Sequence, residues 1–137
     1  MDFNECLSKG KVKKVTIDEL RAKSMIEISR SDLKTSLLIP LKEESKRIIF
    51  RELYEIFKTH IEGIGYLKGY KFLDHISITY FLRDVLDETH LSEKFDRYRK
   101  LRNGINYYGE DIDFSSTREA LETIPRLINY LNKYINI

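Results

Sequence analysis

The sequence predicts an all-α fold, an antiparallel up-and-down bundle of four to five helices. Apolar side chains recur every three or four residues through most of the 137-residue chain, which is the period of an amphipathic helix. Glycine and proline, which interrupt helices, number only six and two. With 42% hydrophobic and 34% charged residues, the composition is typical of a folded protein and excludes a disordered or collagen-like chain. The length fits a single core.

The first fifteen residues lack a helical period and are predicted to form an irregular basic arm. Their cations surround Gly10 and are Lys9, Lys11, Lys13 and Lys14. We therefore divide the chain into a basic N-terminal arm over residues 1–15 and a helical bundle over residues 16–137.

The first two helices of the bundle are predicted at 17–38 and 41–67. Thr16 and Glu19 have the spacing of a capping box, in which a hydroxyl accepts a hydrogen bond from a free amide at the helix start. Pro40 separates the two helices because it cannot continue the first. The second helix has a wide apolar face, made of Ile49, Leu53, Ile56, Phe57, His60 and Ile64.

The remaining helices are separated by turn-forming residues. A turn over 67–72 leads to a third helix, which Asp74 is expected to cap. One side of the fourth helix is apolar up to its end at Gly109 and consists of Leu91, Phe95, Tyr98, Leu101, Ile105 and Tyr108. Ser115 and Ser116 are expected to cap the fifth helix, in which Pro125 predicts a kink or a restart.

The charge and the cysteine content exclude several classes of protein. The formal net charge of +2 is too small to mark the whole chain as a nucleic-acid binder, so such a role requires local clustering of cations. A single cysteine, Cys6, excludes an internal disulfide and a thiolate metal cluster, and it favours a reducing compartment. No apolar run approaches the length of about 18 residues that a membrane span needs. The sequence thus predicts a cytoplasmic protein that does not insert into a membrane.

The densest basic cluster lies on the predicted fourth helix. Its five cations fall within nine residues and are Lys94, Arg97, Arg99, Lys100 and Arg102. At about 100° per residue, Arg99, Asn103 and Asn106 share a polar strip, while Arg102 lies on its opposite flank, near the buried side. This pattern would present several phosphate-binding groups on one helix. Composition alone favours a second interpretation, in which the arginines pair with the acidic loop over 110–113.

The stretch from Tyr98 to Gly109, Tyr-Arg-Lys-Leu-Arg-Asn-Gly-Ile-Asn-Tyr-Tyr-Gly, resembles the motif region of the HEPN superfamily. The long helix over 41–67, the turn that follows it and His75 resemble the middle section of the same family, particularly of its small archaeal members. The resemblance implies a helical bundle that commonly forms a homodimer, in which two copies of the motif meet in a cleft. Many members of the family are metal-independent ribonucleases whose motif is an arginine, four to six further residues and a histidine.

The chain departs from this motif at the histidine. Tyr107 follows Arg102 after four residues, and Asn106 follows Arg99 after six. In the family the histidine transfers protons and the arginine stabilises the charge of the phosphorane. A tyrosine hydroxyl, with a reference pKa of about 10, is a poor base at neutral pH, and an asparagine transfers no proton. The catalytic positions Arg102, Asn106 and Tyr107 therefore form a degenerate motif, with an expected loss of about 10² to 10⁴ in rate.

The other motif residues suit the binding of RNA or phosphate. They are Arg99, Lys100, Asn103 and Tyr108. The resemblance implies no metal and no other cofactor, and the three histidines lack the spacing that gathers a metal on one helix. We interpret His60 as a core imidazole and His75 as support for a helix start. Arg83 and His90 also have the spacing of the family motif, which we interpret as coincidence in an arginine-rich chain.

We therefore predict an RNA-associated, HEPN-like homodimer of a toxin–antitoxin or defence system, with degenerate nuclease chemistry. Two alternatives stay open. In the first, the chain is an active metal-independent ribonuclease toxin that uses Tyr107 or a histidine brought near in the fold. In the second, it is a non-catalytic interaction module that pairs with an MNT-type nucleotidyltransferase antitoxin. In some family members such an enzyme transfers a nucleotide to a tyrosine, and the corresponding position here is Tyr108. The sequence thus leaves open whether the chain is an enzyme.

Overall fold

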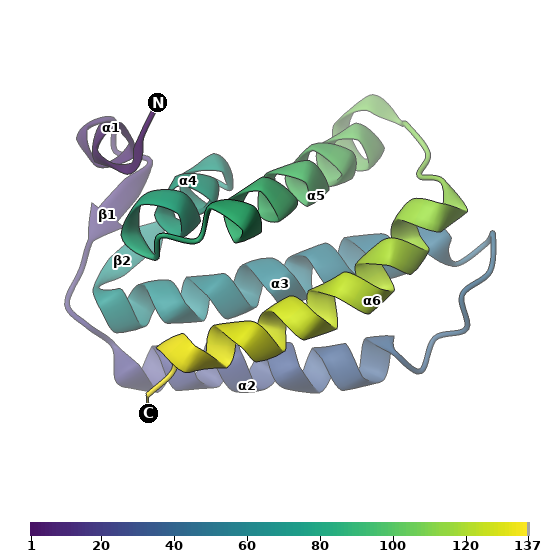
Figure 1. The fold of residues 1–137 in the computed structure, drawn as a ribbon, viewed down its shortest axis with the longest axis horizontal. Coiled ribbons are helices and arrows are strands. Elements are labelled where there is room, and N and C mark those ends of the chain that lie inside the picture. The colour runs from purple at the N-terminus through teal and green to yellow at the C-terminus, as the bar shows by residue number, and fades with distance from the viewer. Residues whose placement is uncertain (137) are drawn as a thin grey trace.

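Long helices form an antiparallel bundle around α3. The computed structural model describes residues 1–136. Its long helices are α2 (Glu19–Ser36), α3 (Lys46–Lys68), α5 (Thr89–Tyr108) and α6 (Phe114–Leu131). α3 runs through the middle and packs against the other three, and successive long helices point in opposite directions (Figure 1). The predicted all-α fold, an up-and-down helical bundle, is confirmed.

α3 supplies much of the core because apolar residues cover a wide sector of its surface. Its fully buried apolar side chains include Ile49, Phe50, Leu53, Tyr54, Phe57, Ile61 and Ile64. The rings of α3 and α5 interlock: Phe57 lies edge-on to Phe95, with ring centroids 5.7 Å apart, and Tyr54 stacks on Phe95 at 5.5 Å. These aromatic contacts set which side of α5 turns inward and which side faces solvent.

Short elements close one end of the bundle. They are α1 (Phe3–Ser8), β1 (Val12–Lys14), β2 (Tyr70–Phe72), α4 (Ile76–Tyr80), the π-helical turn η1 (Phe81–Val85) and the 3₁₀ turn η2 (Asn132–Tyr134). The two strands pair antiparallel, with Val12 opposite Phe72. α1, β1, β2 and α4 lie together at the left of Figure 1. The N-terminal segment is therefore attached to the connection between α3 and α4.

The prediction of an irregular arm over residues 1–15 is wrong, because part of this segment belongs to the core. Phe3 and Cys6 on α1 and Val12 on β1 are all buried. The Asp2 carboxylate caps α1 by accepting a hydrogen bond from a first-turn amide at 2.8 Å. In β1 the valine is buried and the two lysines are exposed. The lysine-rich sequence thus gave no sign of a strand, because the partner strand is almost sixty residues away.

Aspartates, rather than the predicted hydroxyl residues, cap two of the long helices. Asp18 caps α2, where Thr16 was expected, and its carboxylate accepts a hydrogen bond from a first-turn amide at 3.0 Å. Asp113 caps α6 in the same way at 3.0 Å, in place of the serine pair. A carboxylate both accepts the bond and interacts favourably with the positive end of the helix dipole. Asp74 accepts a bond from the start of α4 at 2.9 Å, as predicted.

Two long helices continue through residues that often interrupt helices. α3 continues through Gly63 and Gly65 and ends at Gly69, whose φ of 83° is in the left-handed region that favours glycine. At Gly65 a Cβ atom would come 2.5 Å from Cε2 of Phe72, so this glycine permits the close approach of β2. α6 runs through Pro125 without a restart.

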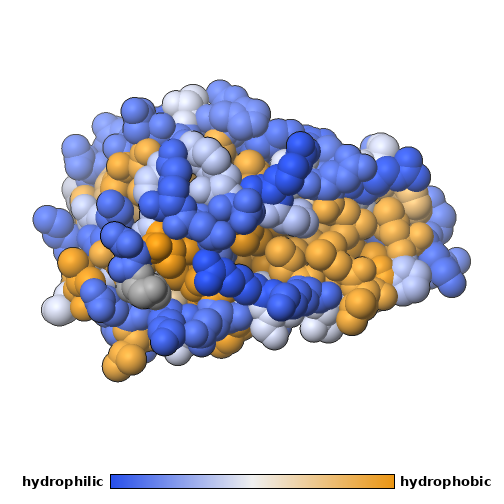
Figure 2. Space-filling view, turned by 60° about the horizontal axis from the view of Figure 1, so that its bottom comes forward, coloured by the Kyte–Doolittle hydropathy of each residue, from blue (hydrophilic) through white to orange (hydrophobic). Residues whose placement is uncertain are grey.

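Exposed apolar side chains gather around the connection between α2 and α3. Leu37, Leu38, Ile39 and Ile48 are between 36% and 81% exposed. Figure 2 shows an apolar area on the half of the molecule that carries this connection, to the right, with hydrophilic side chains around it. The largest exposed apolar area in this view therefore lies away from α1 and the short strands.

Candidate functional site

α5 carries the predicted motif, and its packing decides which motif residues reach solvent. The predicted apolar positions that are buried are Leu91, Phe95, Tyr98 and Ile105. Tyr108 was expected on the same side but is 75% exposed. The helix ends directly after it, at Gly109, whose φ of 64° turns the chain away as predicted. The last turn of α5 therefore projects its side chains beyond the core.

Two cations of the basic cluster hold α5 against α6. Lys94 and Arg97 bind the Glu119 carboxylate at 2.9 and 3.2 Å, and the hydroxyl of buried Tyr98 donates to the same carboxylate at 2.8 Å. Burial raises the pKa of Glu119, but hydrogen bonds from Lys94, Tyr98 and Thr123 outweigh burial and lower it to about 2. These cations therefore join two helices of the bundle.

The next two cations bind an acid on their own helix. Arg99 and Lys100 lie 2.7 and 3.1 Å from the Asp96 carboxylate. The acidic loop over 110–113 does not supply the ion-pair partners that composition favours, and its Asp111 binds Lys46 at 3.4 Å instead. The Arg99 side chain is only 14% exposed, whereas that of Lys100 is 69% exposed. Of this predicted phosphate-binding pair, Lys100 is thus the more exposed.

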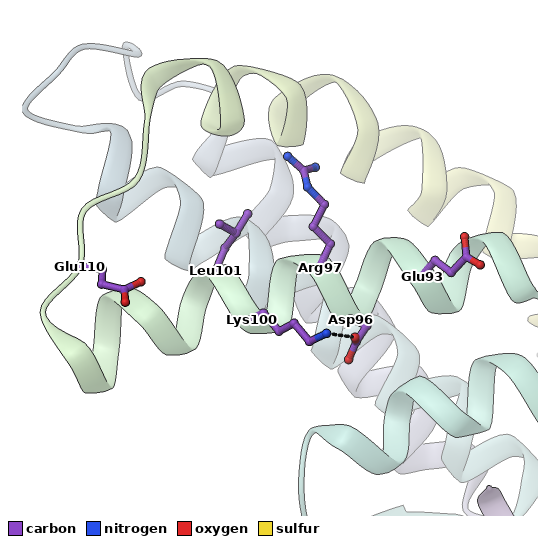
Figure 3. A pocket seen from close by; sticks show the side chains of 6 residues that line it. All are labelled: Glu93, Asp96, Arg97, Lys100, Leu101 and Glu110. Atoms are coloured by element: carbon purple, nitrogen blue, oxygen red, sulfur yellow. Dashed lines mark ion pairs between the residues drawn. The ribbon is translucent and has the colours of Figure 1, made fainter. Parts of the chain in front are cut away.

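A hollow of about 460 Å³ lies beside this ion pair, as Figure 3 shows. Its lining residues are Glu93, Asp96, Arg97, Lys100, Leu101 and Glu110. Lys100 extends toward Asp96 in this view rather than into open space. Three carboxylates against two cations give the hollow a negative balance, which disfavours a polyanion. The better candidate site lies at the end of the same helix.

Arg102 lies between two tyrosine rings at this end of α5. Its Cζ atom is 5.5 Å from the ring centroid of Tyr54 on α3 and 5.5 Å from that of Tyr107. Nη1 donates to the Tyr107 hydroxyl and to the side-chain oxygen of Asn103, both at 3.3 Å, and Nη2 lies 3.5 Å from Glu55. The predicted flank position of Arg102, near the buried side, is confirmed, since its side chain is 15% exposed. The guanidinium is held by stacking and by long polar contacts.

His75 reaches the same cluster from the start of α4. Its Nδ1 atom lies 2.8 Å from the Tyr54 hydroxyl, and the two rings stack with centroids 5.7 Å apart. Burial, followed by the cations of Lys58 and Arg102, lowers the pKa of His75 below its usual value, so the imidazole is neutral at pH 7. Burial also raises the pKa of Tyr54, so its phenol keeps its proton. Tyr54 therefore contacts both the arginine and the histidine.

The sequence did not reveal the contributions of Tyr54, Glu55, Lys58 and His75. Lys58 joins the cluster through Glu55, whose carboxylate lies 3.5 Å from its ammonium. No spacing rule connects these residues with Arg102, because they meet only when α3, α4 and α5 pack. The one useful signal was the flank position of Arg102, which predicts a contact with a neighbouring helix without specifying the residue.

Beyond this cluster, the last turn of α5 carries exposed polar and aromatic side chains. Tyr107 and Tyr108 are 67% and 75% exposed, and Asn106 is exposed beside them. Together with Lys100 and Arg102 they form what we call the motif surface. The C-terminal half of α5 thus carries a guanidinium, an ammonium, an amide and two accessible aromatic rings.

The other histidines lie apart from the motif surface. His60 is fully buried, which confirms the prediction of a core imidazole, and its Nδ1 atom lies 2.8 Å from the Ser29 hydroxyl. Burial lowers the pKa of His60 to about 4. Arg83 binds the neighbouring Asp84 at 2.8 Å, while His90 lines a separate hollow between α5 and α6. Arg83 and His90 are thus engaged in different surroundings.

Within residues 1–136, the side chains of His, Cys, Asp and Glu form no group of three or more that could hold a metal ion. Over the same part of the chain, none of the helices has the length and apolar character required to cross a bilayer. Comparisons with models of known protein families, with curated protein sequences and with solved structures gave no significant match. The HEPN resemblance therefore stays a prediction that depends on the motif residues.

Proposed function

We propose that the chain is a HEPN-like, RNA-associated protein that binds single-stranded RNA through the motif surface. The observation that carries this proposal is the Arg102 guanidinium between the rings of Tyr54 and Tyr107. The 75% exposed ring of Tyr108 directly follows Tyr107 in the last turn of the same helix. Exposed aromatic rings stack on unpaired bases, and nearby cations bind the phosphates between them. Single-stranded RNA offers both unpaired bases and phosphates.

The same surface has the features of a binding site more than those of a nuclease. At the motif positions, Asn106 has no proton to transfer, and the Tyr107 hydroxyl accepts a hydrogen bond from Arg102. A ribonuclease that works without metal needs a group that takes the proton of the ribose 2′-hydroxyl. Neither motif position supplies it, so the proposed role is RNA binding with degenerate nuclease chemistry.

His75 favours a second candidate, the active metal-independent ribonuclease. Its imidazole is neutral at pH 7 and contacts Tyr54, whose ring also stacks with Arg102. In this mechanism Nδ1–H of His75 would donate to the Tyr54 hydroxyl, which leaves Nε2 free to take the 2′-hydroxyl proton. The freed oxygen would attack the adjacent phosphate, and the 5′-oxygen would leave with a proton from water. Arg102 would stabilise the charge of the phosphorane.

Pairing with an MNT-type nucleotidyltransferase is a further proposal on the same surface. The Tyr108 ring is 75% exposed, so another protein would have access to its side chain. Nucleotide transfer to this hydroxyl would add negative charge to the end of the helix that carries Lys100 and Arg102 and so weaken RNA binding.

Metal-free assays of RNA binding and cleavage test these candidates together. We expect wild-type protein to bind single-stranded RNA with an affinity that falls steeply with salt, because phosphate contacts release counterions. Arg102→Ala should weaken binding at least about tenfold, while the matched control Arg51→Ala, an exposed arginine of α3, should change it little.

The outcomes separate the two candidates. Binding without cleavage, in wild type and in His75→Ala alike, supports the proposed role. Metal-independent cleavage that both His75→Ala and Arg102→Ala abolish would replace it with the ribonuclease. Absence of RNA binding at low salt, or equal loss in Arg51→Ala and Arg102→Ala, would overturn both.

A further inference from the structure

The outer face of α2 exposes a stripe without charge. Leu20 and Ile28 are 82% and 54% exposed, and Ser24, Ser31 and Thr35 are exposed as well. At about 100° per residue, these five positions fall within about 80° of the helix circumference. They lie opposite the face that packs against α3, which buries Ala22, Ile26 and Ser29. We call these five residues the α2 stripe.

Charges of both signs line the edges of the α2 stripe. Arg21 and Asp32 lie along one edge, and Lys23, Glu27 and Lys34 lie along the other. A nucleic acid or an anionic membrane would select an excess of cations around such a stripe. Mixed charges around an uncharged seam are instead typical of a helix that packs against another helix. This pattern therefore indicates a protein partner.

The order of large and small residues in the stripe is self-complementary. When two copies of α2 are placed antiparallel about a two-fold axis between Ser24 and Ile28, each large side chain meets a small one. Leu20 lies opposite Ser31 of the second copy, and Ile28 lies opposite Ser24. Large residues facing small ones allow two helices to interdigitate closely.

The same register also matches charge. Arg21 and Asp32 share one edge of the stripe, and in this arrangement each lies opposite the other across the two-fold axis. Asp32 forms no ion pair with any other part of residues 1–136. Arg21 donates to the Tyr66 hydroxyl at 3.2 Å, on the exposed surface. A second copy would thus supply two symmetry-related Arg–Asp pairs.

We propose that two copies of this chain form a dimer through antiparallel packing of their α2 helices. The partner is a second copy because the stripe complements itself in size and in charge in one register. α2 and α5 lie on different sides of α3 (Figure 1), so this dimer leaves both motif surfaces free. It differs from the dimer that the HEPN resemblance implies, in which two motifs meet in a cleft, and it does not depend on the proposed RNA binding.

Sedimentation velocity over a range of protein concentrations tests the dimer. Wild type is expected to form dimers at micromolar concentrations. Ile28→Arg should raise the dissociation constant at least about tenfold, because each interface receives the change twice. Leu73→Arg alters a side chain of similar exposure, 48%, outside the stripe and serves as the matched control. Circular dichroism of each variant verifies that it is folded.

A charge exchange tests the register. Arg21→Asp and Asp32→Arg should each weaken the dimer, and the double variant should restore it, because the pair is then re-formed with its signs exchanged. A wild-type chain that stays monomeric up to high micromolar concentration would overturn the proposal. So would a dimer that Tyr108→Arg dissociates and Ile28→Arg does not, because that result would place the contact at the motif.

Discussion

The two halves of the basic cluster on α5 use their cations differently. Around Glu119, Lys94 and Arg97 bind one carboxylate at 2.9 and 3.2 Å, together with the hydroxyl of buried Tyr98. Around Arg102 the polar contacts are 3.3 to 3.5 Å long, and two rings supply the rest of the surroundings. The first set has short, satisfied bonds that join helices, whereas the second has longer and weaker contacts, as the proposed ligand binding requires. Density of cations in a sequence therefore does not by itself distinguish structural cations from binding cations.

The largest expected effect is the loss of stability when Glu119 is neutralised. Glu119→Gln removes a charge that accepts bonds from Lys94 and Tyr98, so we expect the free energy of unfolding to fall by about 3 kcal/mol. Urea denaturation measures this change. Glu122→Gln, on the exposed side of the same helix, is the control and should change the free energy of unfolding little. RNA binding by folded Glu119→Gln should be unchanged, and a loss of binding there would contradict the separation of the two halves.

As the pH is lowered, the free energy of unfolding should fall in two separate pH ranges, an upper and a lower window. The folded pKa of His60, about 4, lies below its usual value, so the unfolded chain binds the proton first and stability falls between about pH 6.5 and 4. The folded pKa of Glu119, about 2, lies below that of a free glutamate, so the stability it adds is lost between about pH 4.5 and 2. Each shift corresponds to about 3 kcal/mol.

Two variants assign these windows. His60→Asn should flatten the upper window in part, since His75 also has a lowered pKa and contributes there. Glu119→Gln should flatten the lower window only. Urea midpoints measured at intervals of pH provide the data, and a lower window that persists in Glu119→Gln would show that other carboxylates cause it.

The effect of Arg102 should be on binding, with little effect on stability. Its carboxylate partner Glu55 is 44% exposed and 3.5 Å away, so we expect Arg102→Ala to change the free energy of unfolding by less than about 1 kcal/mol. RNA affinity should fall at least about tenfold. Arg102→Lys keeps the charge but loses the flat stacking group, so its RNA affinity should lie between those of wild type and Arg102→Ala. Fluorescence anisotropy with labelled single-stranded RNA checks all three proteins.

Helical periodicity was sufficient to predict the long helices, but not the contacts between distant segments. The apolar spacing of α3, α5 and α6 predicts their inward sides because each helix packs one continuous face against the core. β1 escapes this reasoning, because the burial of Val12 requires β2, which lies far along the chain. The helix caps also escaped it, since Asp18 and Asp113 are closer to the helix starts than the hydroxyl residues that match the capping pattern.

The candidate site was predictable in the same partial way. Positions on α5 follow from helical geometry, so the flank position of Arg102 and the end of the helix at Gly109 were predicted. The contact between Tyr54 and His75 spans twenty-one residues and depends on how the turn before α4 folds back over α3. No periodicity in the sequence encodes how this turn folds. For this reason His75 was interpreted as support for a helix start, whereas it lies within the cluster around Arg102.

The smallest expected effect separates the ring of Tyr107 from its hydroxyl. Tyr107→Phe removes the 3.3 Å contact with Arg102 but keeps the aromatic face, so RNA affinity should stay within about threefold of wild type. Tyr107→Ala removes the ring as well, so RNA affinity should fall at least about tenfold, which is the contribution of one stacked base. Fluorescence anisotropy titrations give the RNA affinity of each variant relative to wild type. If Tyr107→Phe were as weak as Tyr107→Ala, the hydroxyl would be the essential group, and the motif surface would have to act through polar contacts rather than through stacking.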